Sequence, residues 1–126
     1  MLYKSIVIIT VLLIAVSALA ELLFPSTLLT LVGITSNLQM DFLLRTTAVA
    51  LIALLPSLWS ARNSANSPAS QSALFGTAVY MFLSSIVDYQ AYSQGIVNSM
   101  AVPSIIFRIL LGIIILCLMT RGTSKE

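Results

Sequence analysis

The chain has 126 residues, of which 59% are hydrophobic and only 8% are charged, with a formal net charge of +2. Because soluble domains carry about 25% charged residues and bury only part of their surface, this composition excludes a soluble globular domain and indicates a membrane protein. Histidine is absent and Cys117 is the single cysteine, so imidazole-dependent triads, intramolecular disulfides and cysteine metal pairs are excluded, and no metal or cofactor is expected.

Four apolar stretches follow one another along the chain, and each is about long enough to cross a bilayer as a helix. They cover residues 5–24, 42–60, 72–92 and 102–120. Their near-continuous apolar runs do not alternate as the strands of a membrane barrel do, so helices are expected. The predicted fold class is therefore all-α: a four-helix transmembrane bundle that forms a single domain over residues 1–126.

The connections between these spans differ in character. Between the first and second spans, Pro25 suits a helix start, Gly33 suits a helix end, and several apolar residues lie between them. This pattern predicts a short helix at the membrane interface. Residues 60–70 are rich in Ser, Asn and Pro and are expected to form an aqueous loop, and residues 93–99 are expected to form a plain turn.

The first apolar stretch also has the layout of a secretory signal peptide. Lys4 precedes it, and Ala18 and Ala20 form a small-x-small cleavage site that would leave Glu21 as the first residue. The apolar sequence resumes at once with Leu22, which favours an uncleaved span. Both alternatives stay open at this stage, and N-terminal sequencing of the mature protein distinguishes them.

Basic residues outside the apolar stretches predict the orientation. Lys4 precedes the first span, Arg62 lies between the second and third, and Arg121 and Lys125 follow the fourth. In a four-span chain these three places fall on one side of the membrane, and an excess of Lys and Arg marks the cytoplasmic side. The expected localisation is a multi-pass integral membrane protein with both termini cytoplasmic.

Four ionisable residues fall within or at the edges of the spans: Glu21, Arg45, Asp88 and Arg108. At 1.5 Å rise per residue, all of them are expected within roughly 10 Å of the outer membrane face. Such groups are costly in lipid and usually pair inside a bundle. One interpretation is a pocket in which Glu21 or Asp88 acts as an acid or base and the two arginines hold an anion. The other is a pair of structural interhelical ion pairs.

Polar and small residues extend this layer along the helix faces. Tyr80 shares one face of the third span with Asp88, which makes Tyr80 a candidate ligand-binding residue. A small-residue face on the second span favours close helix packing and is expected to point into the bundle. Its members are Thr46, Ala50, Ala53 and Ser57. The interior is therefore expected to be small and polar toward the outer side and apolar toward the cytoplasm.

A family resemblance is carried by residues spread over most of the chain. They are Phe24, Pro25, Leu28, Leu29, Gly33, Arg45 and the run Trp59–Arg62. In these residues the chain resembles a group of small, largely uncharacterised four-helix membrane proteins of bacteria and fungi, and it is more distantly similar to DoxX-like proteins and to the ergosterol-biosynthesis scaffold family. The resemblance implies an accessory or scaffold role beside membrane enzymes, or a small enzyme acting on a lipid or natural product. The membrane would be the plasma membrane in a bacterium or the endoplasmic reticulum in a fungus.

Three functional hypotheses follow from these observations. The first is an accessory or scaffold role in membrane or lipid metabolism, which a closed, salt-bridged core would favour. The alternatives are an isomerase-type or cyclase-type acid/base enzyme, favoured by a cavity open to lipid beside Asp88, and a small proton-coupled transporter, favoured by a water-filled path. The expected partners are the bilayer, other membrane proteins or a second copy of the chain, and an apolar small molecule. The dispersed basic residues argue against a nucleic-acid partner.

Overall fold

The computed structural model describes residues 2–123 and is helical with short connections over that range. Its helices are α1 (Leu2–Leu23), α2 (Pro25–Leu31), α3 (Leu38–Ala61), α4 (Pro68–Ser93) and α5 (Ala101–Thr123). All but α2 are long and apolar enough to cross a membrane. Even α1, with 22 residues, reaches about 33 Å, against a hydrocarbon core of about 30 Å. The predicted four-helix transmembrane bundle with a short helix between the first two spans is confirmed.

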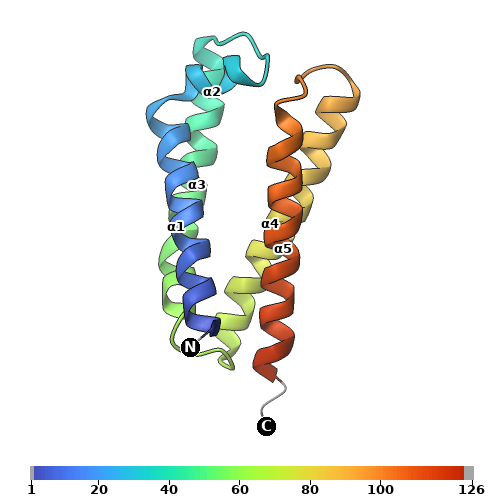
Figure 1. The fold of residues 1–126 in the computed structure, drawn as a ribbon. Coiled ribbons are helices and arrows are strands. Elements are labelled where there is room, and N and C mark those ends of the chain that lie inside the picture. The colour runs from blue at the N-terminus through green and yellow to red at the C-terminus, as the bar shows by residue number, and fades with distance from the viewer. Residues whose placement is uncertain (1, 124–126) are drawn as a thin grey trace.

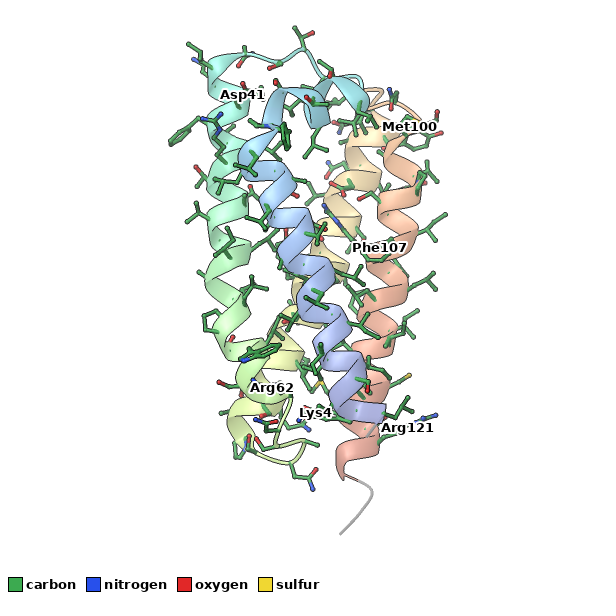
Figure 2. All side chains as sticks on the ribbon, turned by 60° about the vertical axis from the view of Figure 1, so that its left-hand side comes forward. Lys4, Asp41, Arg62, Met100, Phe107 and Arg121 are labelled. Atoms are coloured by element: carbon green, nitrogen blue, oxygen red, sulfur yellow. The ribbon has the colours of Figure 1, made fainter. Side chains whose placement is uncertain are left out.

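The four long helices run up and down, so that the two ends of the bundle differ (Figure 1). The start of α1, the end of α5 and the α3–α4 loop lie at one end, here called the terminal end. The opposite end, here called the capped end, carries α2 and the α4–α5 connection. Figure 2 places Lys4, Arg62 and Arg121 at the terminal end, as the sequence predicts for basic residues on one side. Lys125 lies outside the described residues.

Local signals in the sequence set the helix boundaries. Pro25 occupies the first turn of α2, where its missing N–H costs nothing. Gly33 follows that helix with φ of +85°, a conformation that a side chain would strain. The side chain of Asn37 caps α3 by accepting the third N–H beyond it at 2.9 Å, and Ser67 caps α4 in the same way at 3.1 Å.

The bundle consists of two helical pairs, since α1 packs most closely against α3 and α4 against α5. Gly112 on α5 allows the second pair to come close, because a Cβ there would lie 3.0 Å from the ring of Phe82 on α4. Toward the terminal end the pairs meet in an apolar core whose most buried large side chains are Val7, Leu58, Leu74 and Ile115. The interior at this end is largely apolar, as expected, although the hydroxyl side chains of Thr10 and Ser70 are also buried there.

Most of the helical surface faces away from this core. In the apolar windows of the four long helices, only 17% to 33% of the residues are buried within the bundle. In water such exposed apolar surface would drive aggregation, whereas in a bilayer it meets lipid. The low internal burial therefore agrees with the composition in indicating a membrane protein.

The prediction that the small-residue face of the second span points into the bundle is wrong. Its four members are all exposed on α3: Thr46, Ala50, Ala53 and Ser57. The helix instead buries a face that contains Ala48, Leu51 and Leu58. Leucines on that face fill more of the space between the pairs than alanine and serine would, which favours this rotation of the helix.

Candidate functional site

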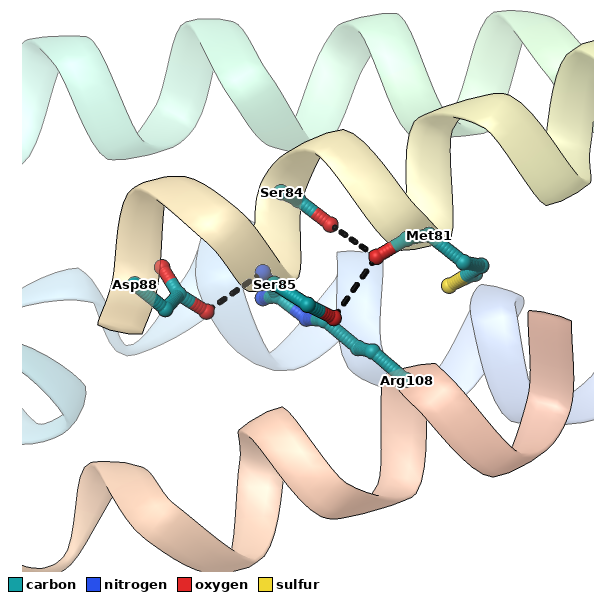
Figure 3. Close-up of polar contacts among 5 residues, drawn as sticks. All are labelled: Met81, Ser84, Ser85, Asp88 and Arg108. Atoms are coloured by element: carbon teal, nitrogen blue, oxygen red, sulfur yellow. Dashed lines mark hydrogen bonds and ion pairs between the residues drawn. The ribbon is translucent and has the colours of Figure 1, made fainter. Parts of the chain in front are cut away.

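An ion pair joins α4 to α5 in the capped half of the bundle (Figure 3). Arg108 on α5 donates from Nη1 to Oδ2 of Asp88 on α4 across 2.7 Å. The side chains are 24% and 33% exposed, respectively. Such a short, charge-assisted bond neutralises both groups and ties the second helical pair together. One of the interhelical ion pairs that the sequence suggested is thus present.

Glu21, near the end of α1, has no such counter-charge bound to it. Its Oε2 atom is buried and has no hydrogen-bond partner among the described residues. Buried carboxylate oxygens normally accept hydrogen bonds, because leaving one unpartnered costs about 1–3 kcal/mol. Glu21 therefore presents an unused acceptor to whatever space lies beside it.

That space consists of two neighbouring cavities between the helical pairs. The mid-bundle cavity has a volume of about 130 Å³ and is lined by all four long helices. The cap cavity has a volume of about 370 Å³ and lies between α2 and the capped ends of the long helices. Glu21, Ser104 and Arg108 line both cavities, so these three residues mark the place where the two meet. The cap cavity falls within the usual size range of small-molecule sites, about 300–1,000 Å³.

The walls of the mid-bundle cavity combine polar groups with apolar and aromatic side chains. Tyr80 on α4 lines it, and its hydroxyl makes no hydrogen bond to any described residue. Phe107 and Ser17 also line the cavity and are exposed on α5 and α1. The cavity therefore lies between α1 and α5 and reaches the lipid-facing surface there. Sequence reasoning had not singled out Ser17, although its position one turn before Glu21 places both on one face of α1.

Other hydroxyls of the polar face of α4 are occupied by the helix itself. Ser84 and Ser85 both donate to the carbonyl oxygen of Met81, at 3.1 Å and 2.7 Å (Figure 3). Thr77 donates to the carbonyl oxygen four residues earlier at 2.8 Å. Hydroxyls bonded in this way are satisfied inside a membrane without a ligand. Within the predicted polar face of α4, Asp88 is therefore the residue that contributes a charged group to the site.

The structure does not bring Arg45 into this cluster. Its side chain is exposed on α3 and makes no hydrogen bond or ion pair with any other described residue. Leu44, the preceding residue, lines the cap cavity instead. Consecutive residues on a helix are turned by about 100° from each other, and here that turn places Arg45 on the exposed surface of α3 while Leu44 faces the cavity. Of the five candidate site residues, Glu21, Tyr80, Asp88 and Arg108 gather around the cavities.

A hydrogen-bonded contact joins the two helical pairs at the capped end, beside the cap cavity. The backbone N–H of Asn98, in the α4–α5 connection, donates to the carbonyl oxygen of Val32 at 2.8 Å. The Asn98 side chain donates to the carbonyl oxygen of Leu31 at 3.1 Å. These bonds tie the second helical pair to the residues that end α2. Residues of α2 therefore form part of the wall of the cap cavity at this end.

The chemistry available at the site is limited to hydrogen bonding, charge and proton transfer. Among the described residues, no group of three acidic, histidine or cysteine side chains lies close enough to hold a metal ion. Comparisons of the chain with protein-family models, with curated proteins and with solved structures find no match. The residues that line the two cavities are consequently the basis for any statement about function.

Proposed function

We propose that this chain is a multi-pass membrane protein that binds an apolar small molecule between its two helical pairs and serves membrane or lipid metabolism in an accessory role. The observation that carries the proposal is the unpartnered Oε2 of Glu21 at the junction of two cavities with largely apolar walls. Small-molecule sites combine mainly apolar walls with a few polar groups that orient the ligand. The family resemblance expected from the sequence would imply the same accessory role.

The position of the site relative to the surface supports a ligand that arrives through the bilayer. The mid-bundle cavity borders exposed residues of α1 and α5, and the cap cavity borders the exposed Leu31 and Met100, so both reach the surface of the bundle. The Asp88–Arg108 pair forms part of the wall and is already satisfied, so it stabilises the site without needing a ligand. Glu21 is the group that gains a partner on binding.

A photoreactive lipid probe tests this proposal. A long-chain alcohol bearing a diazirine, added to the protein in lipid nanodiscs, is expected to label residues of α1 and α5 that line the two cavities. Ser104→Trp fills the junction of the two cavities and is expected to reduce labelling at least fivefold. Ile106→Trp adds the same side chain to an exposed position of the same helix and serves as the control. Labelling spread evenly along all lipid-facing helices in both variants would contradict the proposal.

A second candidate function is acid/base catalysis of an isomerisation or cyclisation on a lipid or natural product. The specific observation in its favour is that Asp88 is bonded to Arg108 while Glu21 is not bonded to any described residue. A base must be free to accept a proton, so Glu21 takes that role and Asp88 becomes structural. Tyr80, which lines the same cavity, is placed to act as the opposing acid.

The lipid content of cells tests the catalytic role. Isomerisation and cyclisation conserve mass, so Glu21→Gln is expected to accumulate a species of unchanged mass and altered chromatographic retention. Asp41→Asn, which removes a carboxylate at the capped end outside both cavities, serves as the control. Identical chromatograms for cells with the parent protein and cells with the Glu21 variant would rule out the catalytic hypothesis and leave the binding proposal standing.

The transporter hypothesis stays a prediction without support from this geometry. Between the cavities and the terminal end, the interior is filled mainly by buried apolar side chains that include Leu58, Leu74 and Ile115. The buried polar side chains there, Thr10, Ser70 and Thr77, carry only hydroxyl groups. A proton or polar substrate needs polar groups or water along its path. The packed terminal half therefore favours binding over passage.

We further propose that the terminal end faces the cytoplasm, in the plasma membrane of a bacterium or the endoplasmic reticulum of a fungus. Support comes from Lys4, Arg62 and Arg121, which share that end of the bundle. A reporter that is active only in the cytoplasm, fused after the last residue, is expected to be active. Activity of a reporter that requires the opposite compartment would reverse the orientation.

A further inference from the structure

The cavities contain an unequal number of acidic and basic groups. Glu21, Asp88 and Arg108 are the ionisable side chains with formal charge at neutral pH that line them, which makes two carboxyl groups and one guanidinium. The guanidinium is bonded to Asp88 at 2.7 Å, and Arg45 lies outside. The group without a bound counter-charge is therefore a carboxyl, and the missing partner is a cation or a hydrogen-bond donor.

We propose that the ligand carries a cationic amine on an apolar body, with the amine at Glu21. This inference rests on the proposed binding function and specifies the polar end of the ligand. An ammonium group donates hydrogen bonds and supplies a counter-charge bonded directly to Glu21, which Arg108, held by Asp88, does not supply. A phosphate or carboxylate would face an unneutralised carboxyl, and the only arginine of the site is already held by Asp88. A neutral alcohol satisfies the hydrogen bond and leaves the charge uncompensated.

The other residues that line the two cavities suit both the amine and the apolar body of such a ligand. Tyr80 and Phe107 line the mid-bundle cavity on the side opposite α1. Aromatic side chains attract cations, and this attraction strengthens where water is excluded. The cap cavity, with about 370 Å³, offers an apolar lining that includes Leu28, Leu29 and Leu44. The amine is thus held at the junction of the cavities while the apolar body occupies the cap cavity.

A series of amphiphiles with one chain length and different polar ends tests the proposal. Dodecylamine, dodecanol and dodecanoate compete with the photoreactive alcohol in nanodiscs of zwitterionic lipid, and each is compared at equal concentration in the membrane. The alcohol and the amine can both donate a hydrogen bond to the Glu21 carboxylate, but only the ammonium adds an opposite charge. The amine is therefore expected to displace the probe at about a tenfold lower concentration than the alcohol. The carboxylate is expected to be weaker than the alcohol.

The variant Glu21→Gln keeps the shape of the side chain and removes its charge. In this variant the preference for the amine over the alcohol is expected to fall to within about twofold, while labelling by the neutral probe persists and shows that the protein is folded. Asp41→Asn, the control, is expected to keep the preference. Its carboxylate lies at the capped end, where it accepts a hydrogen bond from Ser36 at 2.8 Å.

The outcomes separate the two proposals. Equal displacement by all three amphiphiles leaves the binding function standing and overturns the inference about the amine. An amine preference that survives in Glu21→Gln also overturns that inference. Failure of the probe to label α1 and α5 at all overturns the binding function and the inference with it.

Discussion

Breaking the Asp88–Arg108 pair tests whether Glu21 belongs to the same electrostatic cluster. The variant Asp88→Asn keeps an acceptor oxygen and removes one charge. A charge-assisted bond of 2.7 Å stabilises by about 1.5–3 kcal/mol, and partial exposure of both side chains places the loss at the low end of that range. Because Glu21 lines the same two cavities as Arg108, it is available as a replacement counter-charge. We therefore expect Asp88→Asn alone to cost only about 1 kcal/mol.

The double variant separates this explanation from a simple local loss. Glu21→Gln alone is expected to change the free energy of unfolding by less than about 0.5 kcal/mol, because the amide leaves an unpartnered polar group of the same shape in the same place and no bonded ion pair is lost. With both carboxyl groups gone, Arg108 has no counter-charge in the cavities, and the cost is expected to reach about 3 kcal/mol. The sum of the single variants is then about 1 kcal/mol, which leaves a coupling energy of about 2 kcal/mol.

The assay is reversible denaturant-induced unfolding in mixed micelles, followed by the fluorescence of Trp59, the single tryptophan. Asp41→Asn combined with Glu21→Gln serves as the control pair, and its effects are expected to add, since Asp41 lies outside both cavities. A coupling energy between Glu21 and Asp88 below about 0.5 kcal/mol would refute the shared-cluster reasoning.

Three further predictions concern backbone and packing. Gly112→Ala places a Cβ 3.0 Å from the packed ring of α4 and is expected to destabilise by about 1–3 kcal/mol in the same unfolding assay. Gly76→Ala, with open space around it, is expected to be neutral or stabilising; equal losses would contradict the packing explanation. Gly33→Ala and Gly95→Ala both place a side chain on a residue with positive φ. Only at Gly33 would the new Cβ also crowd a neighbour, Asn98, at 3.2 Å, so Gly33→Ala is expected to destabilise the protein more than Gly95→Ala. Asn98→Ala removes the side-chain bond across the capped end and is expected to speed amide exchange in α2 while leaving α1 unchanged.

The spans and the capping helix are predictable from this sequence because they depend on strong local signals. A run of apolar residues must form a helix in lipid, and Pro25 and Gly33 delimit α2 by their backbone preferences. The ionisable residues of the spans cluster near one end of the bundle because successive spans cross the membrane in opposite directions. These residues are Glu21, Arg45, Asp88 and Arg108. These features need no knowledge of which helices are neighbours.

The composition of the site is less predictable because it depends on helix rotation and pairing. Almost every face of α3 is apolar enough for lipid, so the sequence contains little to decide whether Leu44 or Arg45 points inward. Likewise, Arg108 bonds to Asp88 because α4 and α5 pack as a pair. The unused acceptor on Glu21 is a consequence of that pairing, and sequence spacing alone leaves open which carboxyl group receives the arginine.

The division of the bundle into two helical pairs has a consequence for how the protein is made. Each pair is formed by segments close together in the chain, so each closes over a short loop and can assemble soon after its second long helix enters the membrane. The cavities lie between the pairs and come into existence only when the halves dock. Two fragments separated within the α3–α4 loop and produced together are therefore expected to associate into the complete bundle. A ligand bound in the cavities contacts both helical pairs and would stabilise this association.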